Sequence, residues 1–381
     1  MELPLDYTTL RLIWWVLLGV LLIGFAVTDG YDLGVATLLP FVAKTDAERR
    51  LVINTIGPMW EGHQVWLVLG GGAIFAAWPF VYAISFSGFY LAMFVVLASL
   101  ILRPVGFKYR SKRPGAAWRR NWDWALFVGG FVPALIFGVA VGNVLRGVPF
   151  DLDPMLRATY EGGLIGLLNP FGLLAGLISV AMLVTHGASW LVVKAEKGVV
   201  RDRAARFGSI AAIVTVILFV VAGIWVATLL PGYAITSDVV TDGPSNPLRK
   251  TVEVGAGAWL GNYGRHPWMV IAPLMAVAGA AVAAFGLAKK RNAMSLVSSG
   301  VSIAGVVATA GVSMFPFILP SSLNPDASLT VWDSSSSAGT LFFMLIMTAI
   351  FVPLILFYTA WVFKVLWGRV TTDEAQSPGS Y

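Results

Sequence analysis

The chain has 381 residues, of which 57% are hydrophobic and 12% charged, and its mean hydropathy is +0.79. Soluble domains carry about 25% charged residues, so this composition excludes an ordinary soluble protein and indicates a polytopic membrane protein. The absence of cysteine excludes disulfides, cysteine-ligated zinc, iron–sulfur clusters and covalently attached c-type haem.

Apolar stretches of about 20 residues predict nine transmembrane helices. In chain order they lie near 9–40, 52–77, 80–103, 122–145, 165–193, 207–230, 267–288, 294–320 and 338–366. We expect an all-α fold in a single integral-membrane domain, 1–381. The first four and the next four helices would form two bundles, with the ninth helix peripheral. The start of the chain lacks a basic region and a cleavage site, so we interpret it as a retained first helix.

The loops between these helices alternate in charge. Twenty of the 26 Lys and Arg residues fall after the first, third, fifth and seventh helices or in the tail. Because basic residues stay on the cytoplasmic side, we expect a periplasmic N-terminus and a cytoplasmic C-terminus. The net charge of +6 therefore reflects membrane topology rather than binding to nucleic acid.

Two acidic residues interrupt the first apolar stretch. Asp29 and Asp32 are three residues apart, so on a continuous helix they share one face. Charged groups within a membrane are costly, and a chain that keeps them usually uses them. We expect a proton relay or a small-cation site here. The alternative is that the helix ends near Asp29 and the pair caps a turn at the membrane surface.

The second predicted helix contains Glu61, His63 and, three residues further, Trp66. Glu61 and His63 are two residues apart, so they face different directions. A short connection makes the first two helices antiparallel neighbours, and we expect Glu61 to converge with Asp29 and Asp32. Three carboxylates that close resist being ionised together, which suits proton conduction or a bound cation.

Arg103 closes the third apolar run. It is the basic residue best placed to pair with an acid inside the membrane. If Arg103 pairs with Glu61, then Glu61 would have a structural role instead of a proton-carrying role.

Histidines number only three: His63, His186 and His266. His186 could ligate haem or hydrogen-bond across helices. A protein with several haems needs more axial ligands, so this chain alone is a poor candidate for haem redox chemistry.

Several long motifs resemble subunit II of the cytochrome bd-type quinol oxidases, in order and at similar spacing from about residue 11 to residue 369. They are Gly24–Gly34, Trp60–Trp66, Arg103–Phe107, Asn169–Gly176, Phe315–Ser322 and Leu329–Ser337. The resemblance implies a nine-helix subunit of the bacterial cytoplasmic membrane. It would pair with a haem-bearing subunit I and support quinol oxidation coupled to the reduction of oxygen to water.

The same resemblance implies cofactors and roles. Haem b and haem d would be bound by subunit I, and this chain would provide a hydrophilic proton route through Glu61, Asp29, Asp32 and His63. Trp66 and Arg103 would face the partner or line a gas or proton path. A quinone or lipid could bind this chain, and small single-helix accessory subunits could join the complex.

Three positions depart from the family pattern, and at one of them Lys108 stands where relatives are often acidic. The family often has Asp in place of Glu61 and Asn in place of His63, and the histidine adds a second titratable group.

Two other functions stay open from the sequence. A proton-coupled secondary transporter would also use membrane carboxylates and helices broken by proline. A purely structural assembly subunit would conduct nothing.

Overall fold

The computed structural model describes residues 3–377. Its helices are α1 (Tyr7–Val42), α2 (Asp46–Asn54), α3 (Trp60–Ala77), α4 (Pro79–Gly88), α5 (Tyr90–Tyr109), α6 (Ala116–Arg146), α7 (Leu164–Leu167), α8 (Pro170–Lys194), α9 (Val199–Thr228), α10 (Gly261–Arg265), α11 (Ile271–Ala288), α12 (Asn292–Met314), α13 (Ala338–Val365) and α14 (Thr372–Gln376). The strands are β1 (Phe150–Leu152), β2 (Ala158–Tyr160), β3 (Pro231–Ile235), β4 (Val252–Ala256), β5 (Phe317–Leu319) and β6 (Leu329–Thr330). Residues 1–2 and 378–381 of the predicted domain lie outside the described residues.

Within the described range, eight helices are long and apolar enough to cross a membrane, which confirms an all-α membrane protein. They are α1, α5, α6, α8, α9, α11, α12 and α13. The predicted second helix, 52–77, differs from the structure, because α2 ends at Asn54 and α3 begins at Trp60. α3 is 18 residues long and lies along α1, but the polar residues of its first turns lower its hydropathy. The predicted third helix is divided into α4 and α5 at Phe89.

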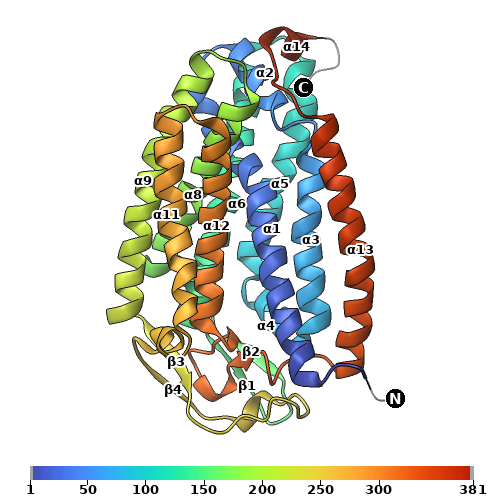
Figure 1. Cartoon of the computed structure of the whole chain (residues 1–381), viewed down its shortest axis with the longest axis vertical. Helices are drawn as coiled ribbons and strands as arrows, with labels where there is room; N and C mark the ends of the chain where they lie inside the picture. Colours follow the sequence, from blue (N-terminus) through green and yellow to red (C-terminus); the bar gives the residue numbers. More distant parts are fainter. Residues whose placement is uncertain (1–2, 378–381) are drawn as a thin grey trace.

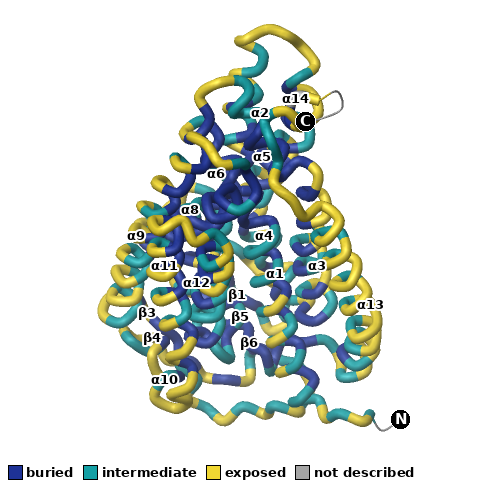
Figure 2. Tube along the Cα trace, turned by 45° about the horizontal axis from the view of Figure 1, so that its top comes forward, coloured by how far each residue is buried: buried dark blue, intermediate teal, exposed yellow. Residues whose placement is uncertain are grey.

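The long helices pack in two groups, as the sequence suggested (Figure 1). In the first group α1 packs on α3 and α6, and α6 packs on α5. In the second group α8, α9, α11 and α12 form a closed ring of contacts. α1 also packs on α8 and α12, and α6 packs extensively on α8, so α1 and α6 together join the two groups. α13 lies outside both groups, and Leu341 alone of its residues is buried, the rest being exposed or intermediate (Figure 2).

Small residues allow α1 to approach its neighbours closely. A Cβ at Gly34 of α1 would lie 2.0 Å from the carbonyl oxygen of Leu183, and one at Gly187 of α8 would lie 2.5 Å from the carbonyl carbon of Gly34. Similarly, a Cβ at Gly130 of α6 would lie 2.6 Å from the carbonyl oxygen of Leu33. Backbone-to-backbone contact of this kind is how membrane helices gain packing energy when lipid supplies no hydrophobic drive.

The two ends of the molecule differ in structure. The basic loops lie at one end together with α2 and α14, whereas the strands form antiparallel hairpins at the other end, beside the N-terminus (Figure 1). A buried ion pair between Lys250 and Asp333, 2.8 Å long, ties two of these hairpin-bearing loops together. Burial lowers the pKa of Lys250, and the negative charge of Asp333 limits that shift. Arg11 of α1 anchors the same loops by donating hydrogen bonds to Ser335 and the Thr241 carbonyl.

We predict that Gly34→Ala lowers the thermal unfolding midpoint of the purified complex, because the added methyl overlaps the backbone of α8. Overpacking of a tight interface costs about 1–3 kcal/mol. Gly19→Ala in the same helix is the matched control, since a Cβ there meets no atom within 4 Å. Alanine favours helix over glycine, so the control should be neutral or slightly stabilising. Equal effects of the two substitutions would contradict the role assigned to this crossing.

Candidate functional site

A buried network of polar side chains occupies the centre of the first helix group. Asp29 and Asp32 are mid-helix residues of α1, which continues ten residues beyond Asp32 to Val42. Both side chains are buried, with 1% and 0% of their surface exposed. The alternative that they cap a turn at the membrane surface is therefore wrong. Their i, i+3 spacing places them on one face, directed at α3 and α5.

Arg103 of α5 binds Asp29 in a bidentate pair. Its Nη1 and Nη2 donate to the two carboxylate oxygens at 3.0 and 2.8 Å, and Nη2 lies 3.8 Å from Asp32. Gly129 of α6 makes room for the arginine stem, because a Cβ there would lie 3.0 Å from its Cγ. The predicted pairing of Arg103 with an intramembrane acid is confirmed, and the acid is Asp29.

His63 of α3 connects Asp32 to Tyr31. Its Nδ1 lies 2.6 Å from Oδ2 of Asp32, and its Nε2 lies 3.0 Å from the Tyr31 hydroxyl. In the neutral imidazole that suits both contacts, Nδ1–H donates to the carboxylate and Nε2 accepts from the phenol. These three side chains form a continuous path of two hydrogen bonds inside the protein.

Aromatic rings fix Tyr31 and His63 in place. The Tyr31 ring stacks on Trp190 of α8 at 4.1 Å between centroids, and the Trp190 Nε1–H donates to the Thr55 carbonyl at 3.1 Å. Phe363 of α13 covers the other side of the His63 ring. Tyr31 and Trp190 were not predicted as site residues. The place of Tyr31 between Asp29 and Asp32 in the sequence could have indicated its role, whereas no sequence pattern indicated Trp190.

Glu61 lies apart from this network. It is in the first turn of α3, two residues from His63, and points to the exposed side of the helix. The two residues face different directions, as predicted. The predicted convergence of three carboxylates is wrong. Glu61 and His63 lie on opposite sides of α3, so when His63 points into the protein Glu61 points out of it. No group of three or more His, Asp or Glu residues within 3–377 could hold a metal ion, and the cation expected at Asp29, Asp32 and Glu61 has no geometric basis.

Trp66 and Arg103 are both buried within this chain. The Trp66 ring packs on Gly24 of α1, 3.2 Å from where a Cβ would stand, and 7% of the residue is exposed. Arg103 is fully buried. That these two residues face the partner or line a gas or proton path stays a prediction. Within this chain, each is a contact of α3 or α5 with α1.

The two intramembrane histidines do not fit haem ligation. Both ring nitrogens of His63 are engaged by Asp32 and Tyr31. In His186, Nδ1 lies 2.7 Å from the Ser299 hydroxyl and Nε2 lies 2.9 Å from the Val27 carbonyl. An axial ligand needs a free ring nitrogen, so either histidine would have to break a buried hydrogen bond to bind iron. The cross-helix hydrogen bonds expected as the alternative for His186 are confirmed.

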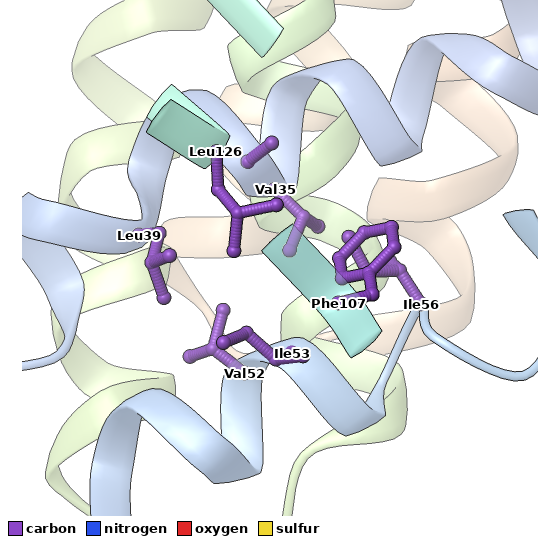
Figure 3. A pocket seen from close by; sticks show the side chains of 8 residues that line it. Val35, Leu39, Val52, Ile53, Ile56, Phe107 and Leu126 are labelled. Carbon is purple, nitrogen blue, oxygen red and sulfur yellow. The ribbon is translucent and has the colours of Figure 1, made fainter. Parts of the chain in front are cut away.

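Toward the end that carries α2, the network gives way to apolar packing. A cavity of about 10 Å³ lies between α1, α2, α5 and α6 and is lined entirely by apolar side chains (Figure 3). An ordered water needs two to four polar partners, so this cavity does not extend the hydrogen-bonded path. Beyond it, Arg110 and Arg49 bind the buried carboxylate of Asp123 at 2.5 and 2.8 Å, which joins α2 to α6.

Comparison with known proteins gives consistent matches over nearly the whole chain. The profile of the family described as cytochrome bd terminal oxidase subunit II matches residues 10–366. The chain is 52% identical to a probable cytochrome oxidase subunit 2 of Haemophilus influenzae, over 97% of both chains. It is 48% identical to cytochrome bd-I ubiquinol oxidase subunit 2 of Escherichia coli K12, over 98% of both. A chain of the solved bd oxidase from Geobacillus thermodenitrificans shares the fold, with a TM-score of 0.63 at 15% identity, covering 95% of this chain and all of that one.

We predict that Asp29→Asn strongly destabilises the protein, because it leaves the Arg103 guanidinium buried beside a neutral side chain. Breaking a buried ion pair from one side costs about 3–5 kcal/mol. In thermal unfolding of the purified complex, the double variant Asp29→Asn/Arg103→Gln should lose less than the two single variants together. Glu253→Gln in β4 is the control, since this exposed acid lies outside the network and should change the unfolding midpoint little. Strict additivity of the two single effects would contradict a direct pairing.

Proposed function

The chain belongs to the cytochrome bd terminal oxidase subunit II family and is part of a quinol:oxygen oxidoreductase, and we propose that it carries protons for oxygen reduction through its buried polar network. The family works as a complex with another subunit. We infer a heterodimer with a haem-bearing subunit I that holds haem b and haem d and oxidises quinol. The engaged nitrogens of His63 and His186 support placing the haems in that partner.

The membrane is, in this proposal, the bacterial inner membrane. The basic loops gather at the end of the molecule that carries α2 and α14, and this end would face the cytoplasm by the positive-inside rule. The N-terminus would then be periplasmic. Protons drawn from the cytoplasm would enter at the same end as Glu61, which lies in the first turn of α3.

The partner would cover the exposed side of α3. Glu61, Val65 and Val68 follow one another at helical spacing, and Val65 and Val68 are 47% and 75% exposed. A carboxylate on an apolar helix face is unfavourable against lipid, so a polar environment supplied by another chain is expected there. Enclosure by the partner would leave Glu61 at the boundary between the two subunits. Its place in the first turn also fits a merely structural role, since an acid there complements the helix dipole.

The observation that carries the proposal is the path Tyr31–His63–Asp32. A proton leaving the Tyr31 hydroxyl can pass to Nε2 of His63 while the Nδ1 proton passes to Oδ2 of Asp32, and an incoming proton taken up by the Tyr31 oxygen restores the hydroxyl. Asp29 is committed to Arg103 through both oxygens. Asp32 differs, because its Oδ1 is buried and has no hydrogen-bond partner among residues 3–377. Of the two acids, Asp32 is therefore the better suited to hold a proton.

Arg103 would serve this path by setting its charge. With Asp29 ionised, the guanidinium balances one carboxylate and contacts the second at 3.8 Å. One further proton shared by Asp32 and His63 makes the whole cluster neutral, which a low-dielectric interior favours. Movement of that shared proton needs no new charge to enter the membrane. Trp66, packed between α1 and α3, would fix the distance between these two helices.

We predict that Glu61→Gln assembles at normal levels but lowers quinol-dependent oxygen consumption by about 10²-fold, as expected for loss of a proton-transferring group. Glu61→Asp keeps the carboxylate and should retain most of the activity. Oxygen electrode measurements on purified, haem-quantified complex provide the test. A fully active Glu61→Gln complex with normal charge translocation would reject the proton role and favour the structural role at the helix start.

We predict that Tyr31→Phe slows proton uptake by at least about tenfold, because it removes the hydroxyl while keeping the ring stacked on Trp190. Proton uptake is followed with a pH-sensitive dye in liposomes that contain the complex. Tyr90→Phe is the matched control, since Tyr90 is 64% exposed on α5, outside the network. Unchanged uptake in Tyr31→Phe, with normal assembly, would remove Tyr31 from the path.

A further inference from the structure

A cavity of about 220 Å³ lies at the end of the molecule that carries α2 and α14, apart from the buried network. A single water needs about 10–15 Å³ on the same measure, so this space can hold a group much larger than water. Its lining comes from the turn between α2 and α3, the end of α8, and the segment that follows α13. The lining residues used below are Lys194, Val365, Leu366, Trp367, Arg369 and Glu374.

The segment after α13 folds back to close this cavity. Val370 forms a parallel bridge with Ala195, in which its N–H donates to the Lys194 carbonyl at 2.8 Å. Thr372 then binds the carboxylate of Glu196. These contacts hold residues 365–370 as a wall in front of the end of α8. The cavity is therefore built by ordered backbone rather than by loosely placed side chains.

Lys194 supplies a buried positive charge at the cavity. Only 5% of the residue is exposed, and its ammonium donates to the Leu366 carbonyl at 2.7 Å and lies 5.8 Å from the Trp190 ring centroid. An ammonium group has three N–H donors, and among residues 3–377 no carboxylate lies within ion-pair distance of this one. A buried charge needs a counter-charge, so an anion is the expected complement.

The other charged groups around the cavity are consistent with an anion. Arg369 lines the same space and adds a second positive charge. Glu374 also lines it, but its carboxylate accepts the Thr371 N–H at 3.1 Å as part of a helix cap. Glu196, nearby in the chain, is bound by Thr372. The two acids thus have their own donors, whereas both cations line the space and neither forms an ion pair with an acid among residues 3–377.

One wall of the cavity is apolar and open to the surroundings. Val365, Leu366 and Trp367 are 61%, 37% and 64% exposed, and they continue the exposed surface of α13. Tryptophan is typical of the membrane–water boundary. A cationic pocket next to an apolar wall at that level complements a molecule with an anionic head and a hydrocarbon chain.

We propose that this cavity binds the phosphate group of an anionic phospholipid, with Lys194 and Arg369 as its counter-charges and Val365 to Trp367 against its acyl chain. The bound lipid would brace the segment after α13 against α8, whose Trp190 stacks on Tyr31. The cavity would thus be a lipid site that this subunit closes with its own C-terminal segment.

Native mass spectrometry of the purified complex, reconstituted with equal amounts of phosphatidylglycerol and phosphatidylcholine, tests this. One phosphatidylglycerol should resist release, and Lys194→Gln and Arg369→Gln should each reduce its retention by about tenfold, the effect of one charge-assisted hydrogen bond. Lys289→Gln, an exposed lysine after α11 at the same end, should match the unaltered complex. Retention that is equal in all variants, or equal for the two lipids, would overturn the proposal.

A second measurement keeps the test valid if Lys194→Gln fails to assemble. Phosphatidylglycerol with a photoreactive acyl chain should cross-link the unaltered complex within residues 365–370. Cross-links confined to other helices would overturn the assignment. Binding of inorganic phosphate alone, without retention of the lipid, would identify a free-phosphate site instead and would likewise overturn it.

Discussion

The structure depends most on a guanidinium that neither water nor lipid can reach. Arg103 must be neutralised where it stands, and Asp29 does this through two parallel hydrogen bonds. A bidentate arginine–carboxylate pair fixes both distance and orientation, so it sets how α5 meets α1. Because Asp29 is fully used by this pair, Asp32 is left to His63. The different roles of Asp29 and Asp32 follow from that single contact.

Close helix packing makes this arrangement possible. Gly34, Gly130 and Gly187 bring α6 and α8 to within backbone contact of α1, so that α1 lies between the two helix groups. The same proximity places Trp190 of α8 against Tyr31, and no more than 3% of the surface of Tyr31, Asp32 or His63 is exposed. The polar path is therefore confined to its own side chains, which is what a relay requires if it is to exclude leakage. The loops at the strand-bearing end act independently, through Arg11 and the Lys250–Asp333 pair.

Much of the fold could be predicted from the sequence, because lipid imposes a length and a composition on each spanning helix. The i, i+3 spacing of Asp29 and Asp32 was also sufficient to place them together, and the position of Arg103 at the end of an apolar run indicated its pairing. The direction of Glu61 could not be predicted. It depends on where α3 begins, and the turn between Asn54 and Trp60 lies within an apolar stretch that looks helical. Nor could the partner of Asp333 be predicted: Asp333 binds Lys250, a long-range contact that local sequence pattern does not encode.

In the proposed relay, Asp32 exchanges a proton through His63 while Asp29 stays bound to Arg103. Infrared difference spectroscopy between the oxidised and reduced complex reports carboxyl protonation directly. The account predicts a carboxyl C=O stretching band that disappears in Asp32→Asn. A spectrum of Asp32→Asn identical to that of the unaltered complex, at normal turnover, would contradict it.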